Sequence, residues 1–263
     1  MHLELNEKVV LIVGASSGIG AATARLLVGE GAKVSLMARR AAELQGVARE
    51  LRSAGGGVLT FAGDAADGRL LQRAVAETVG HFGALHRLVV VAGPMGGRAP
   101  FHELKDEDWN FYFQQSTMVA VRACRLAVPE LLNHEDAAIV LTSAYSIHAQ
   151  KPELVAYTAM KGTIAAISKN LAKTYGPRGL RVNCIAPGVI EKDAENTAML
   201  AKRYSVSVER ARYEFVHREF GMNVALERAG RHEEFADLIA YLLSARASYI
   251  TGATINVDGG TDF

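Results

Sequence analysis

Residues 8–40 constrain the fold more than any other stretch of this chain. The apolar run Val9–Val13 leads into the segment Gly14-Ala15-Ser16-Ser17-Gly18-Ile19-Gly20, and an Ala- and Leu-rich segment then extends from Ile19 to Glu30. A second apolar run, Val34–Met37, follows shortly after. Apolar runs this short, bounded by turn residues, are typical of strands buried on both faces. The order therefore predicts one strand–helix–strand unit of about thirty residues.

The glycine-rich turn inside this unit predicts dinucleotide binding. Gly14 permits a tight exit from the strand, Gly18 lets a pyrophosphate approach the backbone, and Gly20 lets the helix pack closely on the strand. The free N–H groups and positive end of the helix then face the phosphates. Three glycines alone are weak evidence, but their place after a strand and before a helix strengthens the prediction over an ordinary α/β turn.

The composition excludes several other classes of protein. The 263 residues include 29 basic and 28 acidic side chains, a balance that indicates neither a nucleic-acid nor a membrane partner. The N-terminus is charged rather than a signal sequence, and no apolar run reaches the ~18 residues of a membrane span. We expect a soluble, cytoplasmic protein with one domain over residues 1–263. Cys124 and Cys184 lie in apolar patterns, which favours buried thiols, and no spacing of metal ligands occurs.

The remaining pattern alternates apolar runs with amphipathic segments, which predicts a Rossmann-type, doubly wound sheet of seven mostly parallel strands flanked by helices. Further strands are expected at residues 58–61, 85–91, 137–142, 180–185 and 249–258. Helices are expected at residues 41–54, 69–82, 106–133, 155–175, 193–204, 208–220 and 233–243.

The G-x-x-x-G-x-G turn resembles that of the short-chain dehydrogenase/reductase family, and the resemblance extends from Lys8 to Gly260. It implies an enzyme that interconverts a small-molecule carbonyl and an alcohol by hydride transfer with a nicotinamide cofactor. The substrate would be a 3-oxoacyl compound, a ketone or a similar molecule. The resemblance also implies a homodimer or homotetramer.

The end of the second strand favours NADP(H) over NAD(H). Ala38 stands where NAD-preferring units carry an acidic residue that binds the ribose hydroxyls, and Arg39 and Arg40 follow it. A guanidinium matches the oxygens of a 2′-phosphate. The alternative is two solvated arginines at a helix start, where cations are unfavourable.

The resemblance assigns further residues to the cofactor. Asp64 would meet the adenine amino group with the backbone of Ala65 alongside, although Asp64 could instead cap the helix after Asp67. The expected cofactor-binding residues are Gly14, Ser16, Ser17, Gly18, Ile19, Gly20, Arg39, Arg40, Asp64, Ala65, Ala92, Gly93, Tyr157, Lys161, Pro187, Gly188, Val189 and Ile190.

Tyr157 and Lys161 are the expected catalytic pair. Four residues apart on a helix, they share one face. A phenol with a pKa near 10 is a poor acid or base at neutral pH, and a nearby ammonium favours the phenolate and lowers its pKa. In the family that this chain resembles, the tyrosine gives a proton to the carbonyl oxygen, and the lysine also binds the nicotinamide ribose.

Four positions depart from the family pattern. Val90-Val91 replaces two asparagines before Ala92-Gly93, and Lys192 replaces a threonine that contacts the cofactor. Ser116 stands where an asparagine kinks the long helix and holds a water in a proton relay. Serine can also bend a helix and bind water, so Ser116 is a catalytic candidate alongside its reading as an ordinary helix residue.

The fourth departure removes the catalytic serine, because the position thirteen residues before Tyr157 is Ala144. That serine normally polarises the substrate carbonyl, and losing such a donor costs a few kcal/mol in the barrier. Our hypothesis is that Ser143 substitutes for it, with Ser146 or no serine at all as alternatives.

Residues 192–226 have polar helical character and correspond to a lid that covers the substrate pocket in the family. The departures also motivate a different reading of the whole chain: a cofactor-binding protein with weak or no redox activity and a regulatory or scaffold role.

Overall fold

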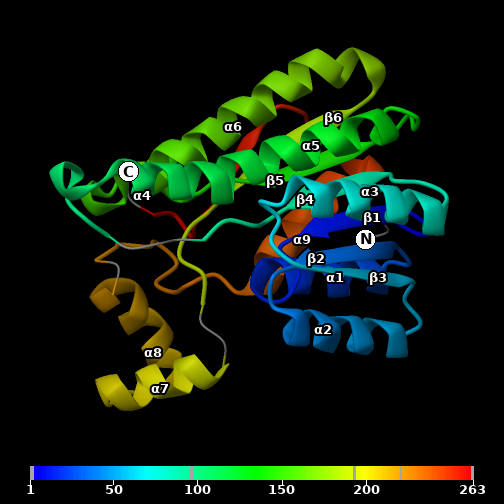
Figure 1. The fold of residues 1–263 in the computed structure, drawn as a ribbon. Helices are drawn as coiled ribbons and strands as arrows, with labels where there is room; N and C mark the ends of the chain where they lie inside the picture. The colour runs from blue at the N-terminus through cyan, green and yellow to red at the C-terminus, as the bar shows by residue number, and fades with distance from the viewer. Residues whose placement is uncertain (1–2, 95–97, 192–193, 220, 262–263) are drawn as a thin grey trace.

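A single sheet of seven parallel strands forms the centre of the molecule (Figure 1). The computed structural model describes residues 3–94, 98–191, 194–219 and 221–261. The strand order is β3-β2-β1-β4-β5-β6-β7. This arrangement confirms the predicted Rossmann-type, doubly wound fold. The strands are β1 (Val9–Val13), β2 (Lys33–Ala38), β3 (Val58–Ala62), β4 (Arg87–Val90), β5 (Ala138–Thr142), β6 (Arg181–Pro187) and β7 (Thr254–Val257).

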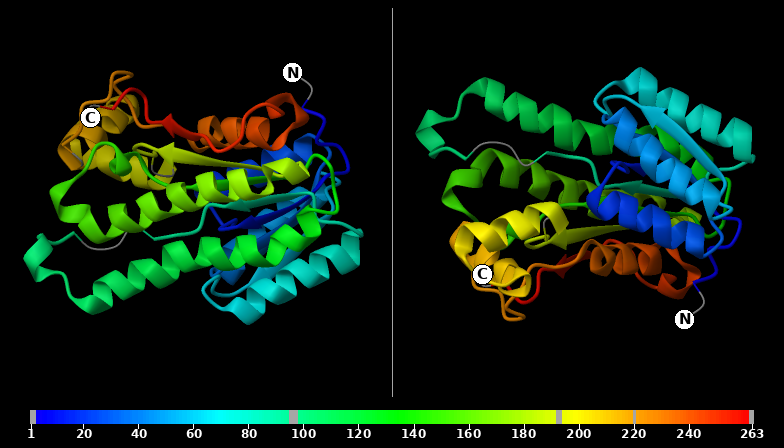
Figure 2. Two further views of the ribbon diagram at one scale, coloured as in Figure 1. Left: turned by 90° about the horizontal axis from the view of Figure 1, so that it is seen from above. Right: turned by 90° about the horizontal axis from the view of Figure 1, so that it is seen from below.

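Helices cover both faces of the sheet, as the two views of Figure 2 show. One face carries α1 (Gly18–Gly29), α2 (Ala41–Ser53) and α9 (His232–Leu243). The other carries α3 (Gly68–Phe82), α5 (Met118–Leu131) and α6 (Val155–Tyr175). Alternate residues of β1 enter opposite cores, which explains why the strand is apolar throughout.

The strand order reverses between β1 and β4, which are hydrogen-bonded neighbours. Chains leave these two strands toward opposite faces, so a crevice opens beyond their carboxyl ends. The glycine turn follows β1 at this point, and residues 91–94 follow β4. The fold therefore places both segments at the carboxyl ends of the strands, where ligands bind in open α/β sheets.

The expected long helix 106–133 is present, but a π-helical segment lies within it. The structure has α4 (Asp106–Tyr112), a π-helical segment Phe113–Thr117, and then α5. Likewise, in the expected helix 208–220, α8 (Val208–Glu214) is followed by a π-helical segment, Phe215–Glu219, and residue 220 lies outside the described residues. Apolar periodicity does not register one extra residue in a turn, so the sequence pattern missed both π segments.

The helices α7 (Ala194–Tyr204) and α8 pack on each other away from the sheet (Figure 1). Phe215 and Val216 join Tyr145, Val189 and Met222 in a third, smaller core. This small core connects the α7–α8 region with the carboxyl ends of β5 and β6. Cys124 and Cys184 are buried free thiols, as predicted. Within the described residues, no helix combines the length and hydropathy needed to cross a bilayer.

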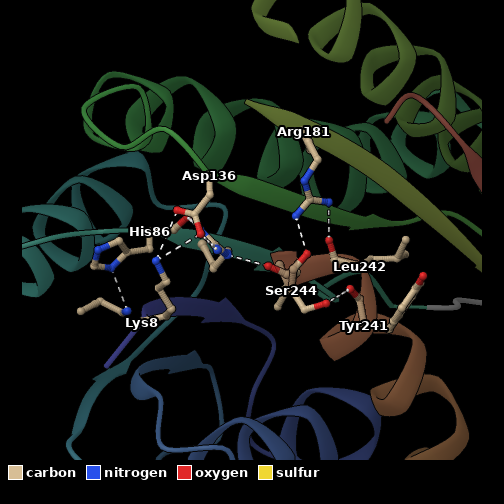
Figure 3. Close-up of polar contacts among 10 residues, drawn as sticks. Lys8, His86, Asp136, Arg181, Tyr241, Leu242 and Ser244 are labelled. Atoms are coloured by element: carbon tan, nitrogen blue, oxygen red, sulfur yellow. Dashed lines mark hydrogen bonds and ion pairs between the residues drawn. The ribbon is translucent and has the colours of Figure 1, made fainter. Parts of the chain in front are cut away.

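At the opposite, amino-terminal ends of the strands, a network of hydrogen bonds holds the C-terminal end of α9 (Figure 3). Arg87 donates to the carbonyl oxygen of Leu243, and Arg181 donates to those of Leu242 and Ser244. Two guanidinium groups thus satisfy the carbonyl end of the helix and complement its dipole. Asp136 balances this charge at 2.8 Å from Arg87.

Candidate active site

The glycine turn has the geometry that its sequence predicts. Gly14 (φ +102°) and Gly18 (φ +57°) adopt positive φ values that side chains rarely tolerate. A Cβ at Gly20 would lie 2.1 Å from the Gly14 carbonyl oxygen, and one at Gly14 would lie 2.9 Å from the Ala92 nitrogen. The turn is therefore packed so closely against the chain leaving β4 that only glycine fits.

A cavity of about 180 Å³ opens beside this turn. It brings together eight of the expected cofactor-binding residues, which come from the loops after β1, β2, β3 and β4: Gly14, Ser16, Arg39, Arg40, Asp64, Ala65, Ala92 and Gly93. Met37, Ala38, Gly63, Pro94, Gln115 and Val119 complete the lining.

Arg40 links two loops of this cavity. Its Nη2 donates to the hydroxyl oxygens of Ser16 (3.3 Å) and Ser17, while Nη1 pairs with Glu43 at 3.5 Å. Both Arg39 and Arg40 are exposed at the cavity wall. The arrangement gathers two cations and two hydroxyls, a donor set that suits a phosphate.

Asp64 is oriented by two neighbours on the cavity wall. Its carboxylate accepts from the Ala66 nitrogen at 2.9 Å and from Nε2 of Gln115 at 3.1 Å. The cap of α3 is Asp67, which accepts from the Arg69 nitrogen, so the alternative role of Asp64 as that cap is wrong. Sequence reasoning missed Gln115, because its position in the π-helical segment has no signal in the apolar pattern.

A second cavity, of about 270 Å³, adjoins the first across Gly93. The expected catalytic residues Tyr157, Lys161 and Ser143 line it, together with Ile19 and the segment Pro187–Ile190. Also on its wall are Val91, Thr142, Ala144, Tyr145, Ser146, Leu154 and Phe215. Most of the predicted cofactor and catalytic residues therefore border two adjoining cavities. The predicted residues that line neither cavity are Ser17, Gly18, Gly20 and Ser116.

Lys161 is buried beneath this second cavity. Its Nζ donates to the Thr142 carbonyl oxygen at 3.1 Å and lies 5.7 Å from the centre of the Tyr157 ring. Burial lowers the pKa of Lys161 to about 8. The ammonium therefore persists at neutral pH but titrates within two pH units of it.

The expected lowering of the Tyr157 pKa is not found. Burial raises this pKa above its usual value, and the nearby phenols of Tyr145 and Tyr112 raise it further. The Tyr112 ring packs edge-on against Tyr157 at 6.0 Å. Desolvation of the phenolate is the largest cause of this shift, so Tyr157 is a neutral, proton-bearing group.

Ser116 lies inside the π-helical segment, next to the junction of the cavities. A Cβ at Gly93 would be 3.1 Å from Ser116 Oγ and 3.2 Å from Lys161 Nζ, so both groups flank Gly93. The buried Ser116 hydroxyl has no hydrogen-bond partner among the described residues. A buried, unsatisfied hydroxyl beside Lys161 suits a bound water or ligand.

Ser143 is not oriented as the sequence hypothesis required. The residue is 2% exposed, and its hydroxyl donates to the Lys161 carbonyl oxygen at 2.8 Å. A serine carries a single proton, which this bond occupies, so Ser143 is not placed to polarise a substrate carbonyl. Ala144 stands beside it on the cavity wall.

The segment after β6 is held from two sides. The Gly188 nitrogen donates to Val257, and the Val189 carbonyl oxygen accepts from the Gly230 nitrogen, each at 2.9 Å. A Cβ at Gly188 would lie 2.6 Å from Asp258 Cα. Lys192, another of the four departures from the family pattern, lies outside the described residues. Among those described, no group of three or more His, Cys, Asp or Glu side chains could hold a metal ion.

Comparison with known proteins identifies relatives along almost the whole chain. A family model described as enoyl-(acyl carrier protein) reductase matches residues 14–262. The chain is 32% identical over 257 residues to an A-factor type gamma-butyrolactone 1′-reductase of Streptomyces virginiae, covering 97% of this chain and 96% of that protein. It is 33% identical over 255 residues to a glucose 1-dehydrogenase of Gluconobacter oxydans, with coverage of 96% and 91%.

Solved structures give the same result. The L-sorbose reductase of Gluconobacter frateurii, complexed with NADPH and L-sorbose, matches with a TM-score of 0.89 and 31% identity, covering 99% of this chain and 98% of that one. A short-chain dehydrogenase/reductase of Serratia marcescens matches with a TM-score of 0.83 and 30% identity, covering 97% and 98%.

Proposed function

Because the chain belongs to the short-chain dehydrogenase/reductase family, we propose that it is an NADP-dependent oxidoreductase that interconverts a carbonyl and an alcohol. The observation that carries this proposal is the pairing of two adjoining cavities. One is lined by Tyr157 and Lys161, and the other by the glycine turn and two arginines. A dinucleotide lying along the crevice would reach from the arginines to the tyrosine.

The residues present fit such a cofactor. The close packing of Gly14 and Gly20 leaves the start of α1 open to a pyrophosphate, and its N–H groups are suitable donors. Arg39 and Arg40 would hold the 2′-phosphate, while Asp64 and Ala65 would meet the adenine. Residues 187–190 would hold the nicotinamide end through their backbone, which β7 and Gly230 keep in place.

When bound, NADPH supplies the hydride that reaches the carbonyl carbon. Tyr157, which burial keeps protonated, donates its proton to the carbonyl oxygen as negative charge develops there. The Lys161 ammonium stabilises the phenolate that remains and would also bind the nicotinamide ribose. Ser116 would hold a water through which Tyr157 regains a proton.

Three further parts of the proposal concern the whole molecule. We propose a single dinucleotide-binding domain in which residues 192–226 cover the substrate cavity, which the contact of Phe215 with that cavity supports. Closure of such a cover excludes water from the reacting atoms. We also propose a homodimer or homotetramer and a cytoplasmic location.

The test is NADPH consumption by the purified protein with ketones, quinones and 3-oxoacyl thioesters. We expect oxidation of NADPH with at least one class, and its loss in the Tyr157→Phe variant, which keeps the ring but not the proton. NADPH binding without consumption by any of these compounds would instead favour the regulatory or scaffold role, for which the missing hydroxyl at Ala144 is the specific observation.

A further inference from the structure

The cavity above Lys161 offers a substrate carbonyl one obvious proton donor, Tyr157. Ala144, on the wall beside it, has a methyl group and cannot donate. Hydride transfer places negative charge on the carbonyl oxygen, and a second aligned donor stabilises that charge strongly in a desolvated site. The question is which side chain of this wall supplies it.

The neighbouring hydroxyls are engaged or enclosed. Ser143 donates to the Lys161 carbonyl oxygen. Ser146 is fully buried and its oxygen accepts from Thr158 Oγ1 at 2.9 Å. The Thr142 hydroxyl is also enclosed, although it has no partner among the described residues.

Tyr145 is different, because it lines the same cavity with an uncommitted hydroxyl. It begins the short 3-10 segment Tyr145–Ile147, directly after Ala144, and is 7% exposed. Within the part of the chain that the structure describes, its hydroxyl makes no hydrogen bond. Its ring packs with Val189 and Phe215 in the third core, which restricts its orientation.

Two electrostatic effects agree with this geometry. Tyr145 and Tyr157 line the same cavity, and a charge on Tyr145 raises the pKa of Tyr157. Burial also raises the pKa of Tyr145 itself, which keeps its hydroxyl protonated at neutral pH. A neutral phenol is a hydrogen-bond donor.

We propose that Tyr145 is a catalytic residue, which donates the second hydrogen bond to the carbonyl oxygen that Tyr157 protonates. During reduction, the hydride reaches the carbonyl carbon from NADPH and the proton reaches the oxygen from Tyr157. Tyr145 keeps its own proton throughout and stabilises the oxygen while its charge develops. This assignment rests on the proposed oxidoreductase function.

The first experiment compares Tyr145→Phe with Tyr112→Phe, which removes a phenol from the other neighbour of Tyr157. With cyclohexanone and NADPH, Tyr145→Phe should lower kcat/KM by about 10²-fold, whereas Tyr112→Phe should change it by less than about threefold. The Kd for NADPH should stay within about twofold in both variants. Equal losses in the two variants would overturn the proposal.

A rescue variant separates a catalytic role from a structural one. Ala144→Ser places a hydroxyl directly before position 145. Added to the Tyr145→Phe variant, it should raise kcat/KM by at least about tenfold. In the otherwise native chain, the same change should have a much smaller effect, because a second donor is already present. Equal gains in both backgrounds would show that Tyr145 does not act as the donor.

A measurement without turnover distinguishes failure of this assignment from failure of the proposed function. Cyclohexanone labelled with ¹³C at the carbonyl is bound together with NADP⁺, a pair that cannot react, and its C=O stretch is recorded by infrared difference spectroscopy. Loss of one hydrogen bond should move the band to higher frequency in Tyr145→Phe but not in Tyr112→Phe.

The four outcomes are distinct. A shifted band with no NADPH consumption by the native chain would refute the proposed function and keep Tyr145 as a carbonyl donor. Consumption with an unshifted band would keep the function and refute the donor role. A shift together with consumption supports both proposals, and absence of both signals refutes both.

Discussion

The Ser143 hydroxyl donates a 2.8 Å hydrogen bond to the backbone carbonyl oxygen of Lys161. This bond ties the end of β5 to the catalytic helix α6. A second bond, from Lys161 Nζ to the Thr142 carbonyl oxygen, runs in the opposite direction. The residue that the sequence suggested as the carbonyl donor is thus hydrogen-bonded to the backbone of Lys161.

Replacement of Ser143 by alanine should therefore affect stability more than chemistry. Loss of one buried hydrogen bond should lower the free energy of unfolding by about 1 kcal/mol. We expect kcat/KM for carbonyl reduction to fall by less than about threefold. Urea denaturation and steady-state kinetics measure the two effects, and a loss of activity approaching a hundredfold at unchanged stability would restore Ser143 as a donor.

The activity should depend on pH through Lys161. Burial lowers its pKa to about 8, so the ammonium is present below this pH and is lost as pH rises through it. In the proposed mechanism the ammonium stabilises the Tyr157 phenolate, so kcat/KM for NADPH-dependent reduction should decline above pH 8. Lys161→Arg, which stays charged, should retain a flat profile at whatever activity remains. A native profile that stays level to pH 10 would contradict the role of Lys161.

Arg40 should select the phosphorylated cofactor. In Arg40→Ala, a phosphate loses a charged hydrogen bond worth about 1.5–3 kcal/mol, so the Kd for NADPH should rise roughly 10- to 100-fold. The Kd for NADH should change little. Isothermal titration with both cofactors measures the difference. Arg49→Ala, which removes an exposed arginine on α2, the helix that begins directly after Arg40, is the matched control. Equal weakening of both cofactors would place Arg40 away from the 2′-phosphate.

Gly20 and Gly29 offer a matched pair within α1. A Cβ at Gly20 would lie 2.1 Å from the Gly14 carbonyl oxygen, whereas one at Gly29 meets nothing within 4 Å. Gly20→Ala should therefore distort the turn, lower the free energy of unfolding by about 1–3 kcal/mol and abolish NADPH binding. Gly29→Ala should leave binding intact and stabilise the fold by about 0.5–1 kcal/mol. Thermal unfolding with and without NADPH tests both variants. Tight NADPH binding by Gly20→Ala would refute the role of the glycine turn in binding the cofactor.

The ion pair between Arg87 and Asp136 should make the stability of the fold sensitive to acid. Burial opposes ionisation of Asp136, but the hydrogen bonds and charges of Arg87 and Lys8 hold its pKa well below the usual range. The contribution of Asp136 to the free energy of unfolding is therefore present above the unfolded-state pKa of about 3.9. It is lost progressively as the pH falls from this value toward the lower pKa of the folded state. Asp136→Asn should lower the free energy of unfolding by about 1–3 kcal/mol at pH 7, because the fully buried Arg87 loses a charged partner.

Urea denaturation from pH 7 to pH 3 measures this contribution. The stability difference between the native chain and Asp136→Asn should shrink toward pH 3. Glu135→Gln, at the exposed neighbouring position, is the control and should have little effect at any pH. A difference that does not depend on pH would show that the carboxylate charge is not what stabilises Arg87.

Local rules account for most of what the sequence predicted correctly. The strand Val9–Val13 and the helix Val155–Tyr175 were predicted with the observed bounds, because an apolar run and a long Ala-rich segment are strong local signals. The glycine turn was equally readable, since its residue types follow from steric limits that only glycine meets. These features depend on neighbours close in the chain.

Tertiary structure decided what local rules leave open. The π-helical segment that carries Gln115 and Ser116 lies between α4 and α5, and apolar periodicity does not record it. The rise in the Tyr157 pKa depends on burial in the assembled site and on the nearby phenols of Tyr145 and Tyr112, which are distant from it in sequence. The orientation of each hydroxyl is likewise a property of the assembled cavity: Ser143 meets the Lys161 carbonyl oxygen eighteen residues away. The sequence by itself thus determined the fold and the chemistry available along the crevice, because these follow from local sterics and periodicity. Which hydroxyl faces the substrate was decided by contacts that exist only once the sheet and its helices have come together.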